Sequence, residues 1–268
     1  MNELTLSEIW IYPIKSLGGI RLTTSRVMPK GLQHDRRWML IDESGTFMTQ
    51  RVYPQMALFK LEIQSDYFII THKDQSRILP FNPAKTTQPE QAIIWDDTVS
   101  VFEVSEDFNR WFSAILGMRC KLVSFPEENA RPVDPKYKVD DEHVSLADAY
   151  PFLIIGQSSL NDLNHRLETP VPMNRFRPNF VFTGGDAYEE DAWRNFTIGT
   201  SRFVGVKPCG RCVLTTVNQD TAEKGKEPLK TLASYRTKNS KVLFGQNLVA
   251  LDHDQINVGD RINVESYE

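Results

Sequence analysis

Short runs of β-branched and aromatic residues, separated by turns that contain proline or glycine, recur along most of this sequence. The first run, Leu4–Tyr12, reads LTLSEIWIY and ends at Pro13. Runs of this kind predict a mainly β (α+β) fold, with a sheet or barrel rich in antiparallel pairing. Similar runs predict strands at Arg21–Met28, Trp38–Ile41, Ala57–Ile63, Tyr67–His72, Gln91–Trp95, Thr98–Glu103, Cys120–Phe125, Phe152–Gly156, Phe180–Thr183, Phe196–Ile198 and Ser201–Val206, with two more between Asn247 and Val264.

Helical periodicity is confined to a few segments. The clearest is Glu106–Leu116, whose apolar residues recur at helical spacing between an N-cap at Ser105 and a stop at Gly117. A second helix is predicted to begin at a Ser158 cap and to run through residue 167. A short third helix is expected to open at Pro228. These helices are expected to lie at the periphery of the sheets.

Composition limits the classes of protein that this chain can belong to. Its 268 residues are 40% hydrophobic and 25% charged, which is typical of a globular protein. The longest apolar runs are too short to span a bilayer, and the N-terminus lacks the pattern of a signal peptide. Only three cysteines are present, which favours a reducing compartment, so we expect a cytoplasmic protein.

The formal net charge of −4 gives no reason to expect bulk attraction to nucleic acid. Basic residues nevertheless cluster locally, at Arg36 with Arg37 and at Arg175 with Arg177. Such clusters in an acidic protein fit a small anionic ligand, although scattered solvated charge explains each cluster taken alone. The polar segment 126–142 carries no apolar period and is expected to be a long surface loop or a seam between two parts of the chain.

Two of the three cysteines stand in the segment Lys-Pro-Cys-Gly-Arg-Cys, residues 207–212. A structural zinc site is disfavoured because no second Cys-x-x-Cys follows, and an iron–sulfur cluster lacks enough thiolates. A thioredoxin-like dithiol would open a helix, whereas the β-branched run Val213–Val217 follows here. A single reactive thiolate near Lys207 and Arg211 remains, acting either as a nucleophile or as a ligand for a soft metal. The third cysteine, Cys120, is expected to be buried and structural.

Five motifs in a fixed order give the chain a resemblance to a known family. They are IYPIKSLGG, GLQHDRRWMLID, DAYPFLII with SSLNDLN, FRPNFV, and PCGRCVLTTVNQDT with KEPLKTLASYR. Together they resemble the MOSC proteins, in particular the bacterial YcbX-like proteins and the mitochondrial amidoxime-reducing components. The resemblance implies a MOSC N-terminal β-barrel-like domain over residues 1–124 and a MOSC β-barrel domain over residues 125–268.

The resemblance also implies a molybdenum cofactor, in which a pterin dithiolene ending in a phosphate holds the metal. The second cysteine of the Cys-x-x-Cys motif matches the family's metal ligand, so that role is expected for Cys212. A soft metal ion fits a thiolate, and a phosphate fits lysine, arginine and loop amides. The positions that match the family's cofactor contacts are Lys15, Ser16, Arg36, Asp148, Arg177, Gly210 and Arg211.

The chain also departs from the family pattern. Asn218 stands where the family has aspartate, and Thr221-Ala222 replaces a Thr-Gly pair, both beyond the expected metal ligand. Cys209 is not the family ligand, and we assign it to packing. Many YcbX-like relatives continue into a ferredoxin-type domain with four more cysteines, which are absent here. Electrons are therefore expected from a separate flavin, haem or iron–sulfur protein.

Three functions follow as hypotheses. The first is a molybdenum-cofactor-dependent oxidoreductase that reduces N-hydroxylated compounds such as hydroxylaminopurines, amidoximes or hydroxylamines. The second is a non-catalytic carrier of molybdenum cofactor or sulfur, with a persulfide on Cys212. The third is a β-rich binding protein whose thiol has no special role.

Overall fold

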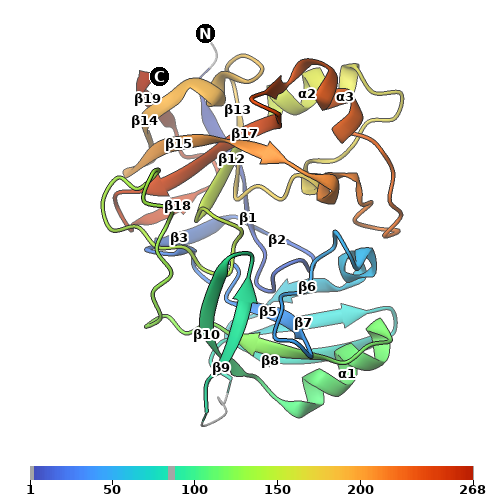
Figure 1. Cartoon of the computed structure of the whole chain (residues 1–268). Coiled ribbons are helices and arrows are strands. Elements are labelled where there is room, and N and C mark those ends of the chain that lie inside the picture. Colours follow the sequence, from blue (N-terminus) through green and yellow to red (C-terminus); the bar gives the residue numbers. More distant parts are fainter. Residues whose placement is uncertain (1–2, 84–87, 268) are drawn as a thin grey trace.

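The fold is mainly β in the computed structural model, as predicted; the structure describes residues 3–83 and 88–267 (Figure 1). The largest sheet in this part of the chain has nine strands, all antiparallel to their neighbours except β12 and β13, which run parallel. Its order is β19 (Ile262–Tyr267), β14 (Trp193–Ile198), β15 (Ser201–Arg211), β17 (Lys241–Ala250), β12 (Phe152–Gly156), β13 (Phe180–Thr183), β1 (Thr5–Ile11) and β2 (Ile20–Leu22), with β16 (Thr237–Lys238) paired to β17.

Three smaller sheets complete the described fold. One has four strands, in the order β5 (Trp38–Asp42), β11 (Cys120–Ser124), β10 (Asp97–Glu103) and β9 (Glu90–Ile94). Another joins β18 (Gln255–Asn257), β3 (Thr24–Met28) and β4 (Gly31–Leu32). The third is the meander of β6 (Lys60–Ile63), β7 (Tyr67–His72) and β8 (Gln75–Pro80).

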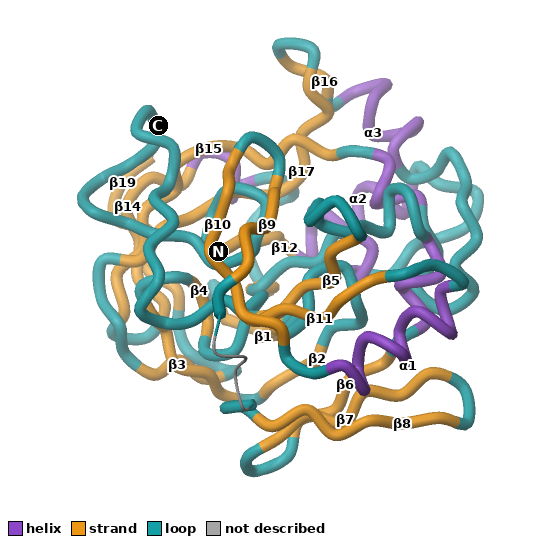
Figure 2. Tube along the Cα trace, turned by 60° about the horizontal axis from the view of Figure 1, so that its bottom comes forward, coloured by secondary structure: helices purple, strands orange, loops and turns teal. Residues whose placement is uncertain are grey.

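The beginning of the chain contributes strands to sheets that its end completes. β1 pairs with β13, and β3 pairs with β18, so residues from both parts of the sequence lie side by side (Figures 1 and 2). The β5 sheet and the β6–β8 meander occupy the other end of the molecule in Figure 1. The domain division at residues 124 and 125 stays a prediction.

Helix α1 (Glu106–Leu116) has the predicted bounds and caps. The Ser105 side chain accepts a hydrogen bond from the Phe108 backbone N–H at 3.3 Å, and Gly117 ends the helix with a φ of 70°. A positive φ is readily adopted by glycine, which explains the stop. Its buried face, Phe108, Trp111, Phe112 and Leu116, belongs to the main apolar core together with Cys120, which is buried as predicted.

The predicted Ser158 cap of helix α2 (Gln157–His165) is wrong. β12 runs directly into the helix, and the N-cap is Gly156, which has no side chain to offer. The buried carboxylate of Glu190 accepts hydrogen bonds there from the Gly156 N–H at 3.0 Å and from the Ser159 hydroxyl at 2.9 Å. Ser158 instead donates to the Gly185 carbonyl. Helix α3 (Leu229–Tyr235) begins after Pro228, as predicted.

Three runs of strand-forming residues differ in the structure from what their composition indicates. Val213–Thr216 is a 3-10 helix rather than a strand, because the Thr215 and Thr216 hydroxyls donate to the Cys212 and Val213 carbonyls and tighten the chain. The run Arg21–Met28 is divided between β2 and β3, which pair in different sheets. Pro54–Leu58 forms a 3-10 helix, so the strand predicted at Ala57 begins at Lys60.

The segment 126–151 is a loop, as predicted for its first part, but it is firmly held. Buried Lys30 donates to the carbonyls of Pro126 and Asn129 at 3.1 and 2.7 Å. Buried Arg131 donates to the Ala147 carbonyl at 2.6 Å and to the Asp148 carbonyl at 3.3 Å. The loop therefore delivers its last residues to a fixed place. Among the described helices, none is long and apolar enough to cross a membrane.

Candidate functional site

A cavity of about 520 Å³ lies where loops from both ends of the sequence meet the end of β15. A volume of this size is in the range of small-molecule and cofactor sites. All eight residues predicted for the site line it, although their sequence positions run from 15 to 212. They are Lys15, Ser16, Arg36, Asp148, Arg177, Gly210, Arg211 and Cys212.

Backbone hydrogen bonds bring three of the contributing loops together. The Lys15 N–H donates to the Trp38 carbonyl at 2.7 Å, and the Arg36 N–H donates to the Tyr12 carbonyl at 3.0 Å. The Leu146 N–H donates to the Arg36 carbonyl at 3.0 Å. These contacts place the loop after β1, the turn before β5 and the loop before β12 next to one another. The site is therefore an outcome of long-range pairing.

Three of the eight predicted residues in the lining adopt left-handed backbone conformations. The φ angles are 67° for Ser16, 50° for Arg36 and 54° for Arg177. Residues other than glycine rarely adopt such angles, and they concentrate at functional sites where the surrounding structure enforces them. Their clustering on one cavity indicates that side-chain direction is specified there at some cost in stability.

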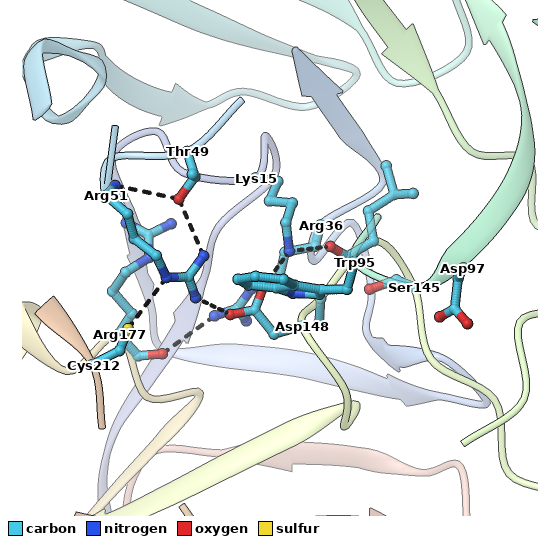
Figure 3. A network of polar contacts seen from close by, with 12 residues as sticks. Lys15, Arg36, Thr49, Arg51, Trp95, Asp97, Ser145, Asp148, Arg177 and Cys212 are labelled. Atoms are coloured by element: carbon cyan, nitrogen blue, oxygen red, sulfur yellow. Dashed lines mark hydrogen bonds and ion pairs between the residues drawn. The ribbon is translucent and has the colours of Figure 1, made fainter. Parts of the chain in front are cut away.

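A chain of polar contacts runs from Cys212 to Lys15 (Figure 3). The Arg51 Nε atom donates to the Cys212 Sγ atom at 3.2 Å, and its Nη2 atom lies 2.6 Å from the Asp148 Oδ2 atom. The other carboxylate oxygen of Asp148 accepts from the Lys15 Nζ atom, also at 2.6 Å. One carboxylate thus holds two cations, one of which reaches the thiol.

Burial and these contacts shift the pKa values of Asp148 and Lys15. Enclosure of the Asp148 carboxylate works against its ionisation, but Lys15 and Arg51 outweigh that effect and hold its pKa far below the usual range. Burial lowers the pKa of Lys15 to about 8, against the opposing effect of Asp148. Asp148 is therefore a carboxylate at neutral pH, and Lys15 is a cation that loses its proton more easily than an exposed lysine.

A second cluster of contacts supports the arginines at the back of the cavity. Arg36 and Arg177 both lie over the Tyr12 ring, with their guanidinium carbons 4.4 and 4.1 Å from its centroid. The fully buried carboxylate of Asp35 accepts from Arg36 Nη1 at 2.6 Å and from Asn179 Nδ2 at 3.1 Å. Burial lowers the pKa of Arg177 to about 10. Both arginines are rigidly held.

The end of β15 supplies the remaining predicted residues. Arg211 donates from Nε to the Phe244 carbonyl at 2.8 Å and from Nη1 to the Phe176 carbonyl at 3.0 Å. Its Nη2 atom is buried and finds no acceptor among the described residues. A buried donor without a partner is costly, so this atom fits a site that a ligand oxygen completes.

The two cysteines of the Cys-x-x-Cys motif have different surroundings. Cys212 Sγ accepts a hydrogen bond from the Arg51 guanidinium, whereas Cys209 Sγ makes a long contact, 3.9 Å, to the Gly210 carbonyl. Cys209 packs against an apolar cluster that includes Phe244, and burial raises the pKa of its thiol. These surroundings favour Cys212 as the chemically active sulfur.

Charge in the cavity is strongly biased. Eight basic side chains line it and Asp148 is the one acidic residue among the described residues of the lining, although the whole chain has a net charge of −4. Such a cavity fits an anionic ligand. The basic residues are Lys15, Arg36, Arg51, Arg175, Arg177, Lys207, Arg211 and Lys241.

The sequence did not identify Arg51, Asp35 or Arg131 as part of this arrangement. Arg51 contacts Cys212 across 161 residues and stands in no motif that predicts it. The Asp35-Arg36 pair was readable as an ion pair, but its position under the cavity depends on Asn179, which is 144 residues away. Arg131 acts through backbone carbonyls, which leave no trace in sequence patterns.

Groups of three or more histidine, cysteine, aspartate or glutamate residues placed to hold a metal ion are absent from the described part of the chain. A metal ion bound through Cys212 would therefore need further donor atoms from a ligand that it arrives with. The fold and the cavity thus define a β-rich protein with a basic, thiol-containing cavity for an anionic ligand.

Comparison with known proteins identifies the family. Residues 3–119 match the model of the MOSC N-terminal beta barrel domain, and residues 141–263 match that of the MOSC domain. Mitochondrial amidoxime-reducing component 1 of Mus musculus is 34% identical, covering 96% of this chain and 81% of its own length. Its counterpart from Homo sapiens is 32% identical over 96% and 82%. The chain belongs to the MOSC family that includes these proteins.

A longer relative matches nearly the whole chain. The molybdenum cofactor sulfurase of Arabidopsis thaliana is 31% identical over 96% of this chain, which corresponds to 35% of the sulfurase.

Proposed function

We propose that this protein binds molybdenum cofactor in the cavity and reduces N-hydroxylated compounds. The observation that carries the proposal is the meeting of Cys212 with seven further residues of the family motifs in one basic cavity. Relatives that match most of the chain are named amidoxime-reducing components. The metal of the cofactor, when bound, supplies two-electron redox chemistry.

The residues present fit such a cofactor. Cys212 offers one thiolate, and the dithiolene sulfurs of the pterin would supply further soft donors. The unpartnered Nη2 atom of Arg211 and the basic residues around it suit the pterin phosphate. Arg36 and Arg177, held rigidly by Tyr12 and Asp35, need little reorganisation to bind an anion. The contacts of Lys15, Ser16, Asp148 and Gly210 with the cofactor are part of the same proposal.

Reduction of an N-hydroxy group to the amine breaks the N–O bond, consumes two electrons and two protons, and releases water. A separate flavin, haem or iron–sulfur protein would supply the electrons. This chain's own residues would hold the cofactor and orient the substrate. Cytoplasmic location stays a prediction from the sequence.

The proposal is tested by producing the protein in a molybdenum-replete host. Molybdenum and pterin are measured per protein molecule, and 6-hydroxylaminopurine is offered with reduced viologen dye. Cys212→Ala should remove nearly all bound molybdenum, whereas the matched variant Cys209→Ala should retain most of it. The opposite pattern would refute the ligand assignment, and stoichiometric molybdenum without turnover would refute the reductase.

A second candidate is a carrier of molybdenum cofactor or sulfur, favoured by the match to a molybdenum cofactor sulfurase. In that case Cys212 would carry a persulfide, with Arg51 adjacent to the sulfur. Mass spectrometry of the purified protein separates the two candidates, because a persulfide on Cys212 in the absence of molybdenum supports only the carrier.

A further inference from the structure

Trp95 occupies an unusual backbone position at the tip of the β9–β10 hairpin. Ile94 pairs with Asp97, which leaves Trp95 and Asp96 as the two central residues of the turn. The φ angle of Trp95 is 54°. A positive φ at the first central residue is the position that glycine favours in tight hairpin turns. A bulky aromatic residue is strained there, so the sequence departs from the residue that the turn alone would favour.

The strained turn carries the indole to the candidate site. The Arg51 guanidinium carbon lies 4.7 Å from the centroid of the Trp95 ring, and the indole Nε1 atom donates to Asp148 Oδ1 at 3.4 Å. Figure 3 shows the indole extending toward Arg51 and Asp148. Trp95 is not among the residues that line the cavity, but it contacts two residues that do. Its place is therefore the mouth of the cavity.

Packing does not account for this arrangement. The Trp95 side chain is 50% exposed, whereas Trp38, Trp111 and Trp193 are buried. Its contact with Phe47, at a centroid distance of 5.1 Å, leaves half of the residue's surface open to solvent. Residues in strained backbone conformations concentrate at functional sites. Trp95 has such a conformation, and half of its surface makes no contact with the core.

We propose that the Trp95 indole is a stacking wall at the mouth of the cavity and that it selects planar, conjugated substrates over aliphatic ones. This inference rests on the proposed reductase function. Arg51 connects this wall to the thiol, because its guanidinium lies over part of the indole and its Nε atom reaches the Cys212 sulfur at 3.2 Å, while half of the surface of Trp95 stays exposed for a substrate. In this proposal, a planar compound rests on the exposed part of the ring with its N-hydroxy group toward the cavity that Cys212 lines. Stacking on an aromatic face favours a conjugated ring by about three- to tenfold.

The test compares two amidoximes with the same reacting group, benzamidoxime and acetamidoxime. Trp95→Gly removes the indole and places at the turn the residue that its φ angle favours, while Trp95→Phe keeps an aromatic face. Lys73→Gly is the matched control, because Lys73 has a φ of 55° at the equivalent tip of the β7–β8 hairpin, where His72 pairs with Gln75. Lys73 is exposed and belongs to a different hairpin.

In Trp95→Gly, the ratio of kcat/KM for benzamidoxime to that for acetamidoxime should fall about three- to tenfold. In Trp95→Phe this ratio should fall less, and in Lys73→Gly it should equal the wild-type ratio. Both glycine variants should unfold at the same or a higher denaturant concentration than the wild type, because each relieves a strained residue. An unchanged ratio in Trp95→Gly, or an equal loss for both compounds, would overturn the proposal.

A binding measurement separates this inference from the proposed reaction. Without an electron donor no turnover occurs, and benzamidoxime should quench the tryptophan fluorescence of the wild type while acetamidoxime should not. Trp95→Phe should lose this response. If the wild type reduces neither compound, the reductase proposal fails. If quenching is equal in wild type and Trp95→Phe, the stacking wall fails.

Discussion

The Nε atom of Arg51 lies 3.2 Å from the Sγ atom of Cys212, although 161 residues separate them in sequence. The same guanidinium pairs with Asp148 and stacks on Trp95, and the Arg51 carbonyl accepts from the Lys224 Nζ atom at 2.6 Å. Arg51 is therefore fixed from several sides. Groups that hydrogen-bond a metal ligand orient it and tune the metal.

Replacement of Arg51 is the first prediction. Arg51→Ala should lower the affinity for molybdenum cofactor by about 10- to 100-fold, because the Cys212 sulfur loses the group that orients it. Arg51→Lys keeps a positive charge but not the planar fork, so it should recover only part of the loss. Molybdenum per protein molecule after dialysis measures the effect. Exposed Arg202→Ala is the control, and equal retention by Arg51→Ala and the control would contradict the prediction.

The second prediction concerns the carboxylate under the cavity. Asp35→Asn leaves the Arg36 guanidinium without its buried partner, so the free energy of unfolding should fall by about 3–5 kcal/mol. Asp252→Asn breaks the more exposed pair with Arg202 and should cost about 1 kcal/mol or less. Urea unfolding measures both variants. Similar losses for the two would show that Asp35 contributes no more than a surface ion pair.

Glu190 gives a prediction about pH. Burial raises its pKa to about 7 from an ordinary value of 4.5, against hydrogen bonds that favour the carboxylate. The folded protein therefore keeps this proton between pH 4.5 and 7 while the unfolded chain releases it. The contribution of Glu190 to stability is full below pH 4.5 and is lost as pH rises to about 7, by roughly 3 kcal/mol at most.

Denaturant unfolding between pH 5 and 8 tests whether stability falls as the pH rises. Glu190→Gln mimics the protonated acid, so it should lack this fall in stability and should exceed the wild type at pH 8. Exposed Glu168→Gln should follow the wild type. Parallel stability curves for wild type and Glu190→Gln would contradict the assignment.

Gly19 gives a steric prediction. A Cβ atom at this position would lie 2.5 Å from the Tyr12 ring, which contacts both Arg36 and Arg177. Gly19→Ala should therefore displace the ring, lower the unfolding free energy by about 1–3 kcal/mol and weaken cofactor retention. Gly225→Ala, where the nearest atom is 3.9 Å away, should change neither quantity by much. Unaltered retention in Gly19→Ala would show that the ring tolerates the methyl group.

Local chemistry made much of the fold predictable. Helix α1 could be placed from Ser105, its apolar period and Gly117, because all the deciding contacts lie within the helix or its caps. The Ser158 cap failed because the competing carboxylate comes from Glu190, far along the chain and buried by packing. The β propensity of Val213–Thr216 did not lead to a strand, because threonine hydroxyls donate hydrogen bonds to nearby carbonyls and favour the 3-10 helix.

The candidate site divides in the same way. Residues in recognisable motifs, such as Lys15 and Cys212, could be expected to meet from the resemblance. Arg51, Trp95 and Arg131 could not, because their importance comes from contacts made only after distant strands pair. Outside the recognised motifs, sequence position does not predict which arginine faces a cavity.

The shared sheet of β1, β12, β13 and β15 has a consequence for folding. Lys15 and Asp148, 133 residues apart, sit on the same cavity, and neither part of the chain encloses it alone. A ligand that touches both works as a non-covalent cross-link between the two ends of the molecule. Its binding energy adds to the stability of the whole chain rather than to that of one half. Ligand binding in the cavity is thereby coupled to the folding of both parts of the chain.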